Sequence, residues 1–277
     1  MLYKHHEKCY ETCMDLSALA FLPTPRISLP GGFDVNLQIL LRWVHFIAGI
    51  TWLGLLYFFN LVNIPFMKEI EGPARSKVVT ALLPRALWWF RWAAVVTVLA
   101  GIWYWMMIVH TDAHNGQANG GMAIGSFFAI WTAVFAIEMG MLMSPAEALK
   151  KGPVLGVVMG VSVVVAGYLY LALNSHGWES NHLLSIGIGG GLGWFMLLNV
   201  WGLIWRAQKK IIRWTNENAA NGTPVPAEAA KLGRMVFLVS RINFALSFPM
   251  LFFMAAASHY PMFSGQFSVL SSRFSVG

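Results

Sequence analysis

Six long apolar segments dominate this chain, and short polar connections separate them. A helix needs about 20 mainly apolar residues to cross the hydrocarbon core of a membrane, and each of the segments meets that requirement. Proline, glycine and charged residues gather in the connections. The pattern predicts an all-α fold, a polytopic transmembrane bundle of about six helices. The expected spans are about 37–62, 86–109, 121–143, 153–174, 182–205 and 234–257.

The composition excludes an ordinary soluble domain. Hydrophobic residues make up 57% of the chain and charged residues only 11%, whereas soluble domains contain about 25% charged residues. The formal net charge of +7 comes mainly from the connections between apolar segments, where basic residues orient a membrane protein. We therefore expect lipids and other membrane subunits as partners, and no nucleic acid.

The basic residues lie mainly in alternate connections. Twelve of the 19 Lys and Arg residues fall in the three odd-numbered connections, whereas the connections at 110–120 and 175–181 have none. Lys and Arg concentrate on the cytoplasmic side of membrane proteins, so we expect both termini outside, periplasmic in a bacterial inner (cytoplasmic) membrane. The predicted domains are an outer N-terminal tail at 1–36, the bundle at 37–262, and an outer C-terminal tail or linker start at 263–277.

Most histidines gather toward the outer face in this topology. Of the eight histidines, only His45 lies clearly within a span. Neutral imidazole is the usual axial ligand of b-type haem and a frequent metal ligand, so we predict that His45 pairs with His259 or His182 to hold haem b between facing helices. The alternative is that outer histidines are polar residues of the membrane interface, an interpretation that we favour for His110, His114 and His176.

Arg42 precedes His45 by three residues, so both side chains project from one face of the first helix. An arginine there can bind a haem propionate or a lipid phosphate. The alternative is an interfacial anchor, whose apolar stem lies along the helix while its guanidinium reaches water. The predicted cofactor-binding residues are thus His45, His259, His182 and Arg42, and we assign no catalytic residue or metal ligand.

Two further features lie within spans. Arg91, Glu138 and Arg241 sit near the inner side, and opposite charges at similar depth lower one another's burial cost, so a structural ion pair is favoured over a proton path. The run GIGGGLG at 187–193 has the glycines of a dinucleotide loop. It lies in an apolar span with no preceding strand, so it indicates close helix packing.

The two cysteines, Cys9 and Cys13, lie in the N-terminal tail, and the chain contains no C-x-x-C-H stretch. No haem is therefore attached covalently to the chain as given. His5 and His6 stand nearby, but the spacing matches no strong zinc or iron–sulfur signature. A disulfide or free thiols are favoured over a metal site.

Several stretches resemble a known family: LRWVHFIAGITWLG in the first span, WFRWAAVVTVLAG in the second and INFALSFPMLFFMAAASHYP in the sixth. They are similar to the membrane domain at the N-terminus of the bacterial membrane-bound urate oxidase (urate hydroxylase) family. The resemblance implies function at His45 and His259, with Arg42 beside the first. Some members carry a C-terminal cytochrome c module, and some have a histidine before the asparagine that corresponds to Asn243, where this chain has Ile242.

Three functions remain open at this point. The first is an integral membrane subunit of a respiratory or photosynthetic electron-transfer complex, which anchors or serves a periplasmic cytochrome c or cytochrome c domain and binds haem near the outer face. The second is a membrane-bound urate-oxidising enzyme domain, which the missing haem-attachment motif and Ile242 weaken. The third is a structural subunit of a larger membrane assembly. We favour the first, a non-catalytic redox subunit.

Overall fold

A computed structural model of the chain describes residues 31–263. The chain divides into two compact units, residues 1–37 and residues 38–277, and the bundle discussed below belongs to the second. Every regular element of the described residues is helical, which confirms the all-α prediction. Most of the two predicted tails, with Cys9 and Cys13, lies outside the described residues. Six continuous helical stretches are long and apolar enough to cross a membrane: Phe33–Glu69, Gly72–Asn115, Gly121–Met143, Gly152–Leu173, Asn181–Asn221 and Glu228–Ala256.

Local sequence explains where several helices begin and end. Proline occupies the first turn of α3 (Gly72–Lys77) and of α6 (Gly152–Leu173), where the missing amide hydrogen costs no helical bond. The Ser180 side chain caps α7 by accepting from Leu183 N, and Gly222 ends α8 at a positive φ of 69°. The elements are α1 (Phe33–Tyr57), π-helical η2 (Phe58–Asn63), α2 (Ile64–Glu69), α3 (Gly72–Lys77), π-helical η3 (Val78–Leu82), α4 (Leu83–Asn115), α5 (Gly121–Met143), η4 (Glu147–Lys150), α6 (Gly152–Leu173), α7 (Asn181–Leu198), π-helical η5 (Asn199–Ile204), α8 (Trp205–Asn221) and α9 (Glu228–Ala256).

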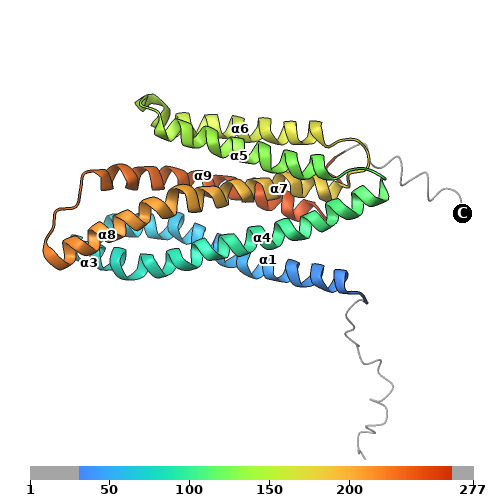
Figure 1. The fold of residues 1–277 in the computed structure, drawn as a ribbon. Coiled ribbons are helices and arrows are strands. Elements are labelled where there is room, and N and C mark those ends of the chain that lie inside the picture. Colours follow the sequence, from blue (N-terminus) through green and yellow to red (C-terminus); the bar gives the residue numbers. More distant parts are fainter. Residues whose placement is uncertain (1–30, 264–277) are drawn as a thin grey trace, which may run out of the picture. The chain divides into compact units, whose positions relative to one another are not determined.

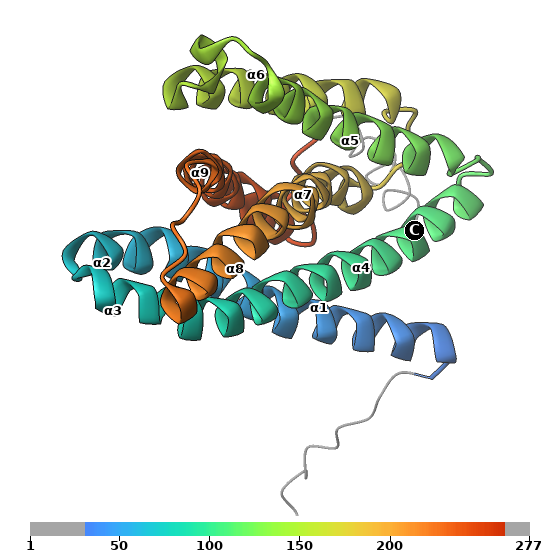
Figure 2. The same ribbon diagram turned by 60° about the vertical axis from the view of Figure 1, so that its left-hand side comes forward.

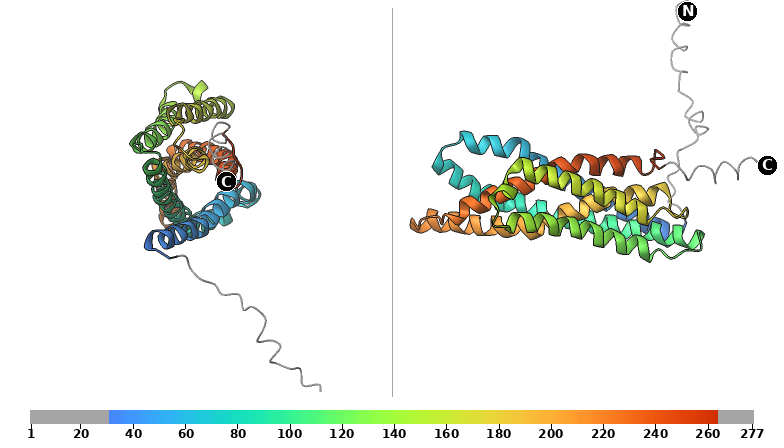
Figure 3. Two further views of the ribbon diagram at one scale, coloured as in Figure 1. Left: turned by 90° about the vertical axis from the view of Figure 1, so that its right-hand side faces the viewer. Right: turned by 90° about the horizontal axis from the view of Figure 1, so that it is seen from above.

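Within residues 38–277 the long helices pair into three layers. Figures 1 and 2 show α5 with α6 in one layer, α7 with α9 in the middle, and α1 with α4 in the third. The end-on view in Figure 3 shows α1, α4, α7 and α9 arranged around a common centre. This arrangement places side chains of the middle layer opposite those of α1 and α4.

The glycine run of α7 allows close helix packing. A Cβ atom on Gly187 would overlap the Tyr170 ring, and one on Gly191 would overlap the indole of Trp131. Trp131 Nε1 also donates to the Gly187 carbonyl oxygen at 3.1 Å. Because only glycine leaves room for these rings, α5 and α6 both approach α7 closely, and the packing interpretation of residues 187–193 is confirmed.

The connections separate by charge between the two ends of the bundle. Figure 1 shows the α2–α3, α5–α6 and α8–α9 connections together at one end, and the α4–α5 and α6–α7 connections at the other. We call the first the basic end, because it contains the Lys- and Arg-rich residues 68–85, 144–151 and 206–234. The second is the histidine end, which contains residues 110–120 and 175–181.

The helix at the basic end extends further than the sequence suggested. The sequence predicted that the fifth span ends near residue 205. Instead the helix continues as α8 to Asn221. It is amphipathic, with Ala207 buried against α9 and basic residues such as Lys209 and Lys210 exposed, so a polar sequence remains helical by packing one face.

Candidate functional site

His45 lies on α1 with one ring nitrogen fixed by α4. Its Nδ1 atom lies 2.7 Å from the backbone carbonyl oxygen of Thr97. A carbonyl oxygen only accepts, so Nδ1 carries the hydrogen and Nε2 keeps its lone pair. A Cβ on Gly101 would lie 2.7 Å from the same ring, so this glycine makes room for the imidazole. The ring is therefore held in one tautomer with a free basic nitrogen.

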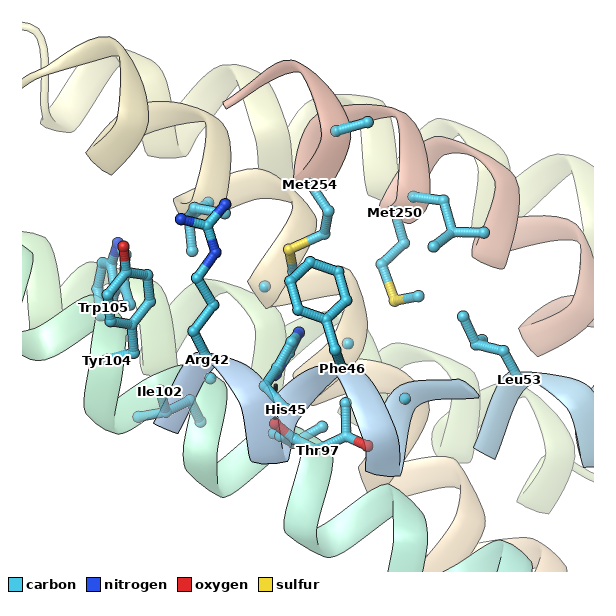
Figure 4. Close-up of a pocket in the computed structure, with 18 of the residues that line it drawn as sticks. Arg42, His45, Phe46, Leu53, Thr97, Ile102, Tyr104, Trp105, Met250 and Met254 are labelled. Carbon is cyan, nitrogen blue, oxygen red and sulfur yellow. Dashed lines mark hydrogen bonds between the residues drawn. The ribbon is translucent and has the colours of Figure 1, made fainter. Parts of the chain in front are cut away.

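That arrangement is typical of a metal-binding histidine. Such residues usually donate their other ring N–H to a carbonyl or carboxylate, which orients the ring and raises its basicity. Figure 4 shows His45 projecting from α1 between Arg42 and Phe46, toward Met250 and Met254 of α9. The free nitrogen of His45 can therefore bind a ligand placed between these helices.

A cavity of about 470 Å³ lies in front of His45, between α1, α4, α7 and α9. This volume is within the range of about 300 to 1,000 Å³ that is usual for ligand pockets. Its walls are mainly hydrocarbon, aromatic rings, glycine and thioether sulfur. All four predicted cofactor-binding residues line it: Arg42, His45, His182 and His259. The structure thus brings together side chains from three distant parts of the sequence.

His182, in the first turn of α7, is the second imidazole of the cavity. Its Nδ1 lies 3.2 Å from Ser258 Oγ, and its ring packs edge-on against Tyr104 at a centroid distance of 6.0 Å. Its Nε2 is buried and has no hydrogen-bond partner among the described residues. A buried nitrogen without a hydrogen-bond partner is energetically unfavourable, so Nε2 of His182 is a candidate for binding a ligand.

His259 and Arg42 lie at the rim. His259 follows the end of α9 and is exposed, and its ring lies 6.5 Å from that of Tyr260. Arg42 is also exposed, and no carboxylate of the described residues pairs with it. Figure 4 shows its guanidinium beside the cavity. An unpaired guanidinium at the mouth of an apolar cavity suits an anionic group of a ligand.

The remaining described histidines lie away from this cavity. His110 and His114 line a separate surface hollow at the α4–α5 connection. His176 Nδ1 lies 2.9 Å from Oε1 of Glu179, whose side chain is buried. Among the described residues, no group of three or more His, Cys, Asp or Glu side chains is placed to hold a metal ion. The sequence did not predict that the Glu179 side chain is buried, because the residue lies in a short polar connection.

The expected ion pair among Arg91, Glu138 and Arg241 is wrong. None of the three pairs with another described charge. The Arg91 guanidinium carbon lies 3.7 Å from the ring centroid of Trp205, and that of Arg241 lies 5.5 Å from the ring of Phe237. Aromatic faces stabilise these cations, and Glu138 is left without a basic partner.

Comparison with known proteins identifies the family. The family described as urate oxidase N-terminal matches residues 69–271, a range that contains His182 and His259 and begins after Arg42 and His45. No curated protein and no solved structure matches the chain. A match over most of the length, ending beyond α9, shows that this chain belongs to the urate oxidase N-terminal family.

Proposed function

We propose that this chain is an integral membrane subunit of an electron-transfer complex and that it binds b-type haem in the cavity between α1, α4, α7 and α9. His45 would hold the haem iron together with His182, and His259 is the other candidate for the second ligand. Haem held by two imidazoles supplies one-electron transfer. The single observation that carries the proposal is the tautomer of His45, whose Nε2 lone pair faces an apolar cavity because Nδ1 donates to Thr97.

The donor set and the walls of the cavity fit haem. The buried Nε2 of His182 has no partner among the described residues, and iron would provide one. The apolar side chains of Met250, Met254 and Phe46 line the cavity and suit contact with a porphyrin face. Arg42 at the rim would bind a propionate, which needs a charged partner and access to water.

The proposed orientation follows the distribution of charge. The Lys- and Arg-rich connections lie at the basic end, which the positive-inside rule assigns to the cytoplasm. The cavity residues Arg42, His182 and His259 then lie toward the periplasm. A cytochrome c or cytochrome c domain on that side is the proposed electron partner, and the proposed location is the bacterial inner membrane.

Urate oxidation is the second candidate, because the family is described by that activity. Urate presents several hydrogen-bonding groups, and each of them would need a polar partner on burial. Most of the lining is apolar, and its polar side chains are those of Arg42, His45, Trp52, Thr97, Tyr104, Trp105, His182, Ser258 and His259. Those of Thr97 and Trp105 already donate to backbone carbonyl oxygens. The geometry therefore favours haem over a purine in this cavity.

The test is a reduced-minus-oxidised visible spectrum of the purified protein, with pyridine haemochrome analysis. We expect a b-type signal that His45→Ala abolishes. The same substitution at His182 and at His259 identifies the second ligand. His110→Ala is the matched control, since His110 lies outside the cavity.

Two outcomes would reject the proposal. One is a purified protein that contains no b-type haem and takes up none on addition of haemin. The other is a haem signal that survives His45→Ala unchanged. Consumption of urate by the same preparation, lost in a cavity variant, would establish the second candidate instead.

A further inference from the structure

Glu138 on α5 is a buried carboxyl group without a hydrogen-bond partner. Its exposed fraction is 0%, and neither carboxyl oxygen has a partner among the described residues. Glu179 provides a contrast: it is 1% exposed, but its oxygens accept from the backbone and ring nitrogens of His176 at 2.8 and 2.9 Å. Both acids are buried, but only Glu179 has donors at full hydrogen-bond distance among the described residues.

Two asparagines from other helices form the polar surroundings of Glu138. The Asn199 amide, at the start of η5, lies close enough to interact with the Glu138 carboxyl group, but no contact between them has the distance and angle of a full hydrogen bond. Asn199 Nδ2 donates to Asn243 Oδ1 on α9 at 2.9 Å, and Asn243 Nδ2 donates to the Met196 carbonyl oxygen at 3.2 Å. Asn199 Oδ1 is buried without a partner among the described residues. Three acceptor oxygens, two of Glu138 and one of Asn199, therefore lack a donor.

The backbone is built to bring Glu138 and Asn199 together. Asn199 opens the π-helical segment η5, a rare conformation that occurs frequently at functional sites. One turn further along, a Cβ on Gly202 would lie 2.9 Å from Phe135 Cζ. Phe135 precedes Glu138 by one turn of α5, so the absence of a side chain at Gly202 allows α5 and η5 to approach closely here.

No basic side chain of residues 31–263 forms an ion pair with the Glu138 carboxyl group. Helix α6, which packs on α5, carries only tyrosines as titratable residues, and α7 carries only His182 at the histidine end. Arg91 on α4 and Arg241 on α9 are the basic residues that the sequence places at a depth similar to that of Glu138. Both guanidinium groups lie against aromatic rings. The other titratable residues of these two helices are Arg85, Tyr104, His110, Asp112, His114, Glu228, Lys231 and Arg234. The short helix η4, which also packs on α5, carries Glu147 and Lys150, which pair with each other at 3.2 Å.

One proton bound to the Glu138 carboxyl group would supply a hydrogen-bond donor that the site lacks. It makes one Glu138 oxygen a donor, and Asn199 Oδ1 is the unpaired acceptor on the neighbouring side chain. It also removes the charge of a carboxylate that has no partner in a low-dielectric interior. Hard cations such as Ca²⁺ and Mg²⁺ take about six or more oxygen ligands, and the three unpaired oxygens here fall short of that number.

We infer that Glu138, with Asn199 and Asn243, is a membrane-embedded proton-binding site. Glu138 lies five residues before the end of α5 at Met143, about 7 Å from the basic end at the helical rise of 1.5 Å per residue. The basic end is therefore the nearer aqueous phase for proton exchange. The inference goes beyond the proposed function and does not require haem, because the site lies on other helices than His45.

Infrared spectroscopy of the purified full chain at neutral pH tests the inference. A protonated carboxyl group gives a C=O stretching band distinct from that of a carboxylate. We expect one such band, which shifts when glutamate is labelled with ¹³C and when water is replaced by D₂O. These two shifts need no variant, so the test does not depend on the folding of a mutant.

Glu138→Gln should abolish the band, and Glu179→Gln is the matched control that should retain it, since Glu179 is equally buried but has donors. Absence of the band in the unmodified protein overturns the inference. A band that survives Glu138→Gln also overturns it. Loss of the band on addition of Ca²⁺, Mg²⁺ or Na⁺ would assign a cation site in place of a proton site.

Discussion

The Nδ1 atom of His45 lies 2.7 Å from the backbone carbonyl oxygen of Thr97, and this contact directs the other ring nitrogen into the cavity. Two helices form this contact. The imidazole belongs to α1, whereas α4 carries both the acceptor oxygen and Gly101, which leaves room for the ring because it has no side chain. The relationship leads directly to a prediction about that glycine.

Substitution of Gly101 should displace His45 without removing it. A Cβ at this position would lie 2.7 Å from the His45 ring, so Gly101→Val should turn the imidazole away from Thr97. We expect at least a tenfold loss of haem occupancy, measured by pyridine haemochrome per protein. Gly54→Ala, on α1 with no atom within 4 Å of the new Cβ, should keep full occupancy. Equal occupancy in both variants would contradict this role for Gly101.

The packing of α5 on α7 should be sensitive to one methyl group. A Cβ on Gly191 overlaps the Trp131 indole, and overpacking of this kind costs about 1–3 kcal/mol. We expect Gly191→Ala to lower the free energy of unfolding in detergent by that amount. Gly156→Ala on α6 meets no atom within 4 Å and should not destabilise the protein. A neutral result at Gly191 would mean that the helices are less tightly packed than described.

The stacking of Arg91 on Trp205 should contribute measurable coupling. The guanidinium carbon lies 3.7 Å from the ring centroid, and such contacts are worth about 0.5–2 kcal/mol. A double-mutant cycle with Arg91→Gln and Trp205→Leu should yield a coupling in the free energy of unfolding of about 1 kcal/mol. Trp103, which is 54% exposed, provides the control partner and should show no coupling to Arg91.

The sidedness of the two ends can be measured with single cysteines. With Cys9 and Cys13 replaced by serine, Asn119→Cys at the histidine end should react with a membrane-impermeant maleimide added to intact spheroplasts. Ala220→Cys at the basic end, where Ala220 is exposed, should react only after permeabilisation, because the positive-inside rule places that end in the cytoplasm. The reverse labelling pattern would invert the proposed orientation and would move the cavity to the cytoplasmic half.

The hydrophobic pattern by itself determined the number and order of the spans, because each apolar segment must bury its backbone in a helix to cross a membrane. It also predicted the packing role of the glycines at 187–193 and placed Arg42, His45, His182 and His259 near one end. These features depend on local composition and helical spacing, which a single sequence carries.

Only the tertiary structure decided which side chains meet. The contact of His45 with Thr97, the unpaired Nε2 of His182 and the isolation of Glu138 from Arg91 depend on which helices adjoin and how they are rotated. Residues far apart in the chain come together there because α7 lies in the middle layer and its glycines allow close approach. Helix pairing and rotation arise from packing across the whole bundle, so they could not be predicted from the periodicity of any one span.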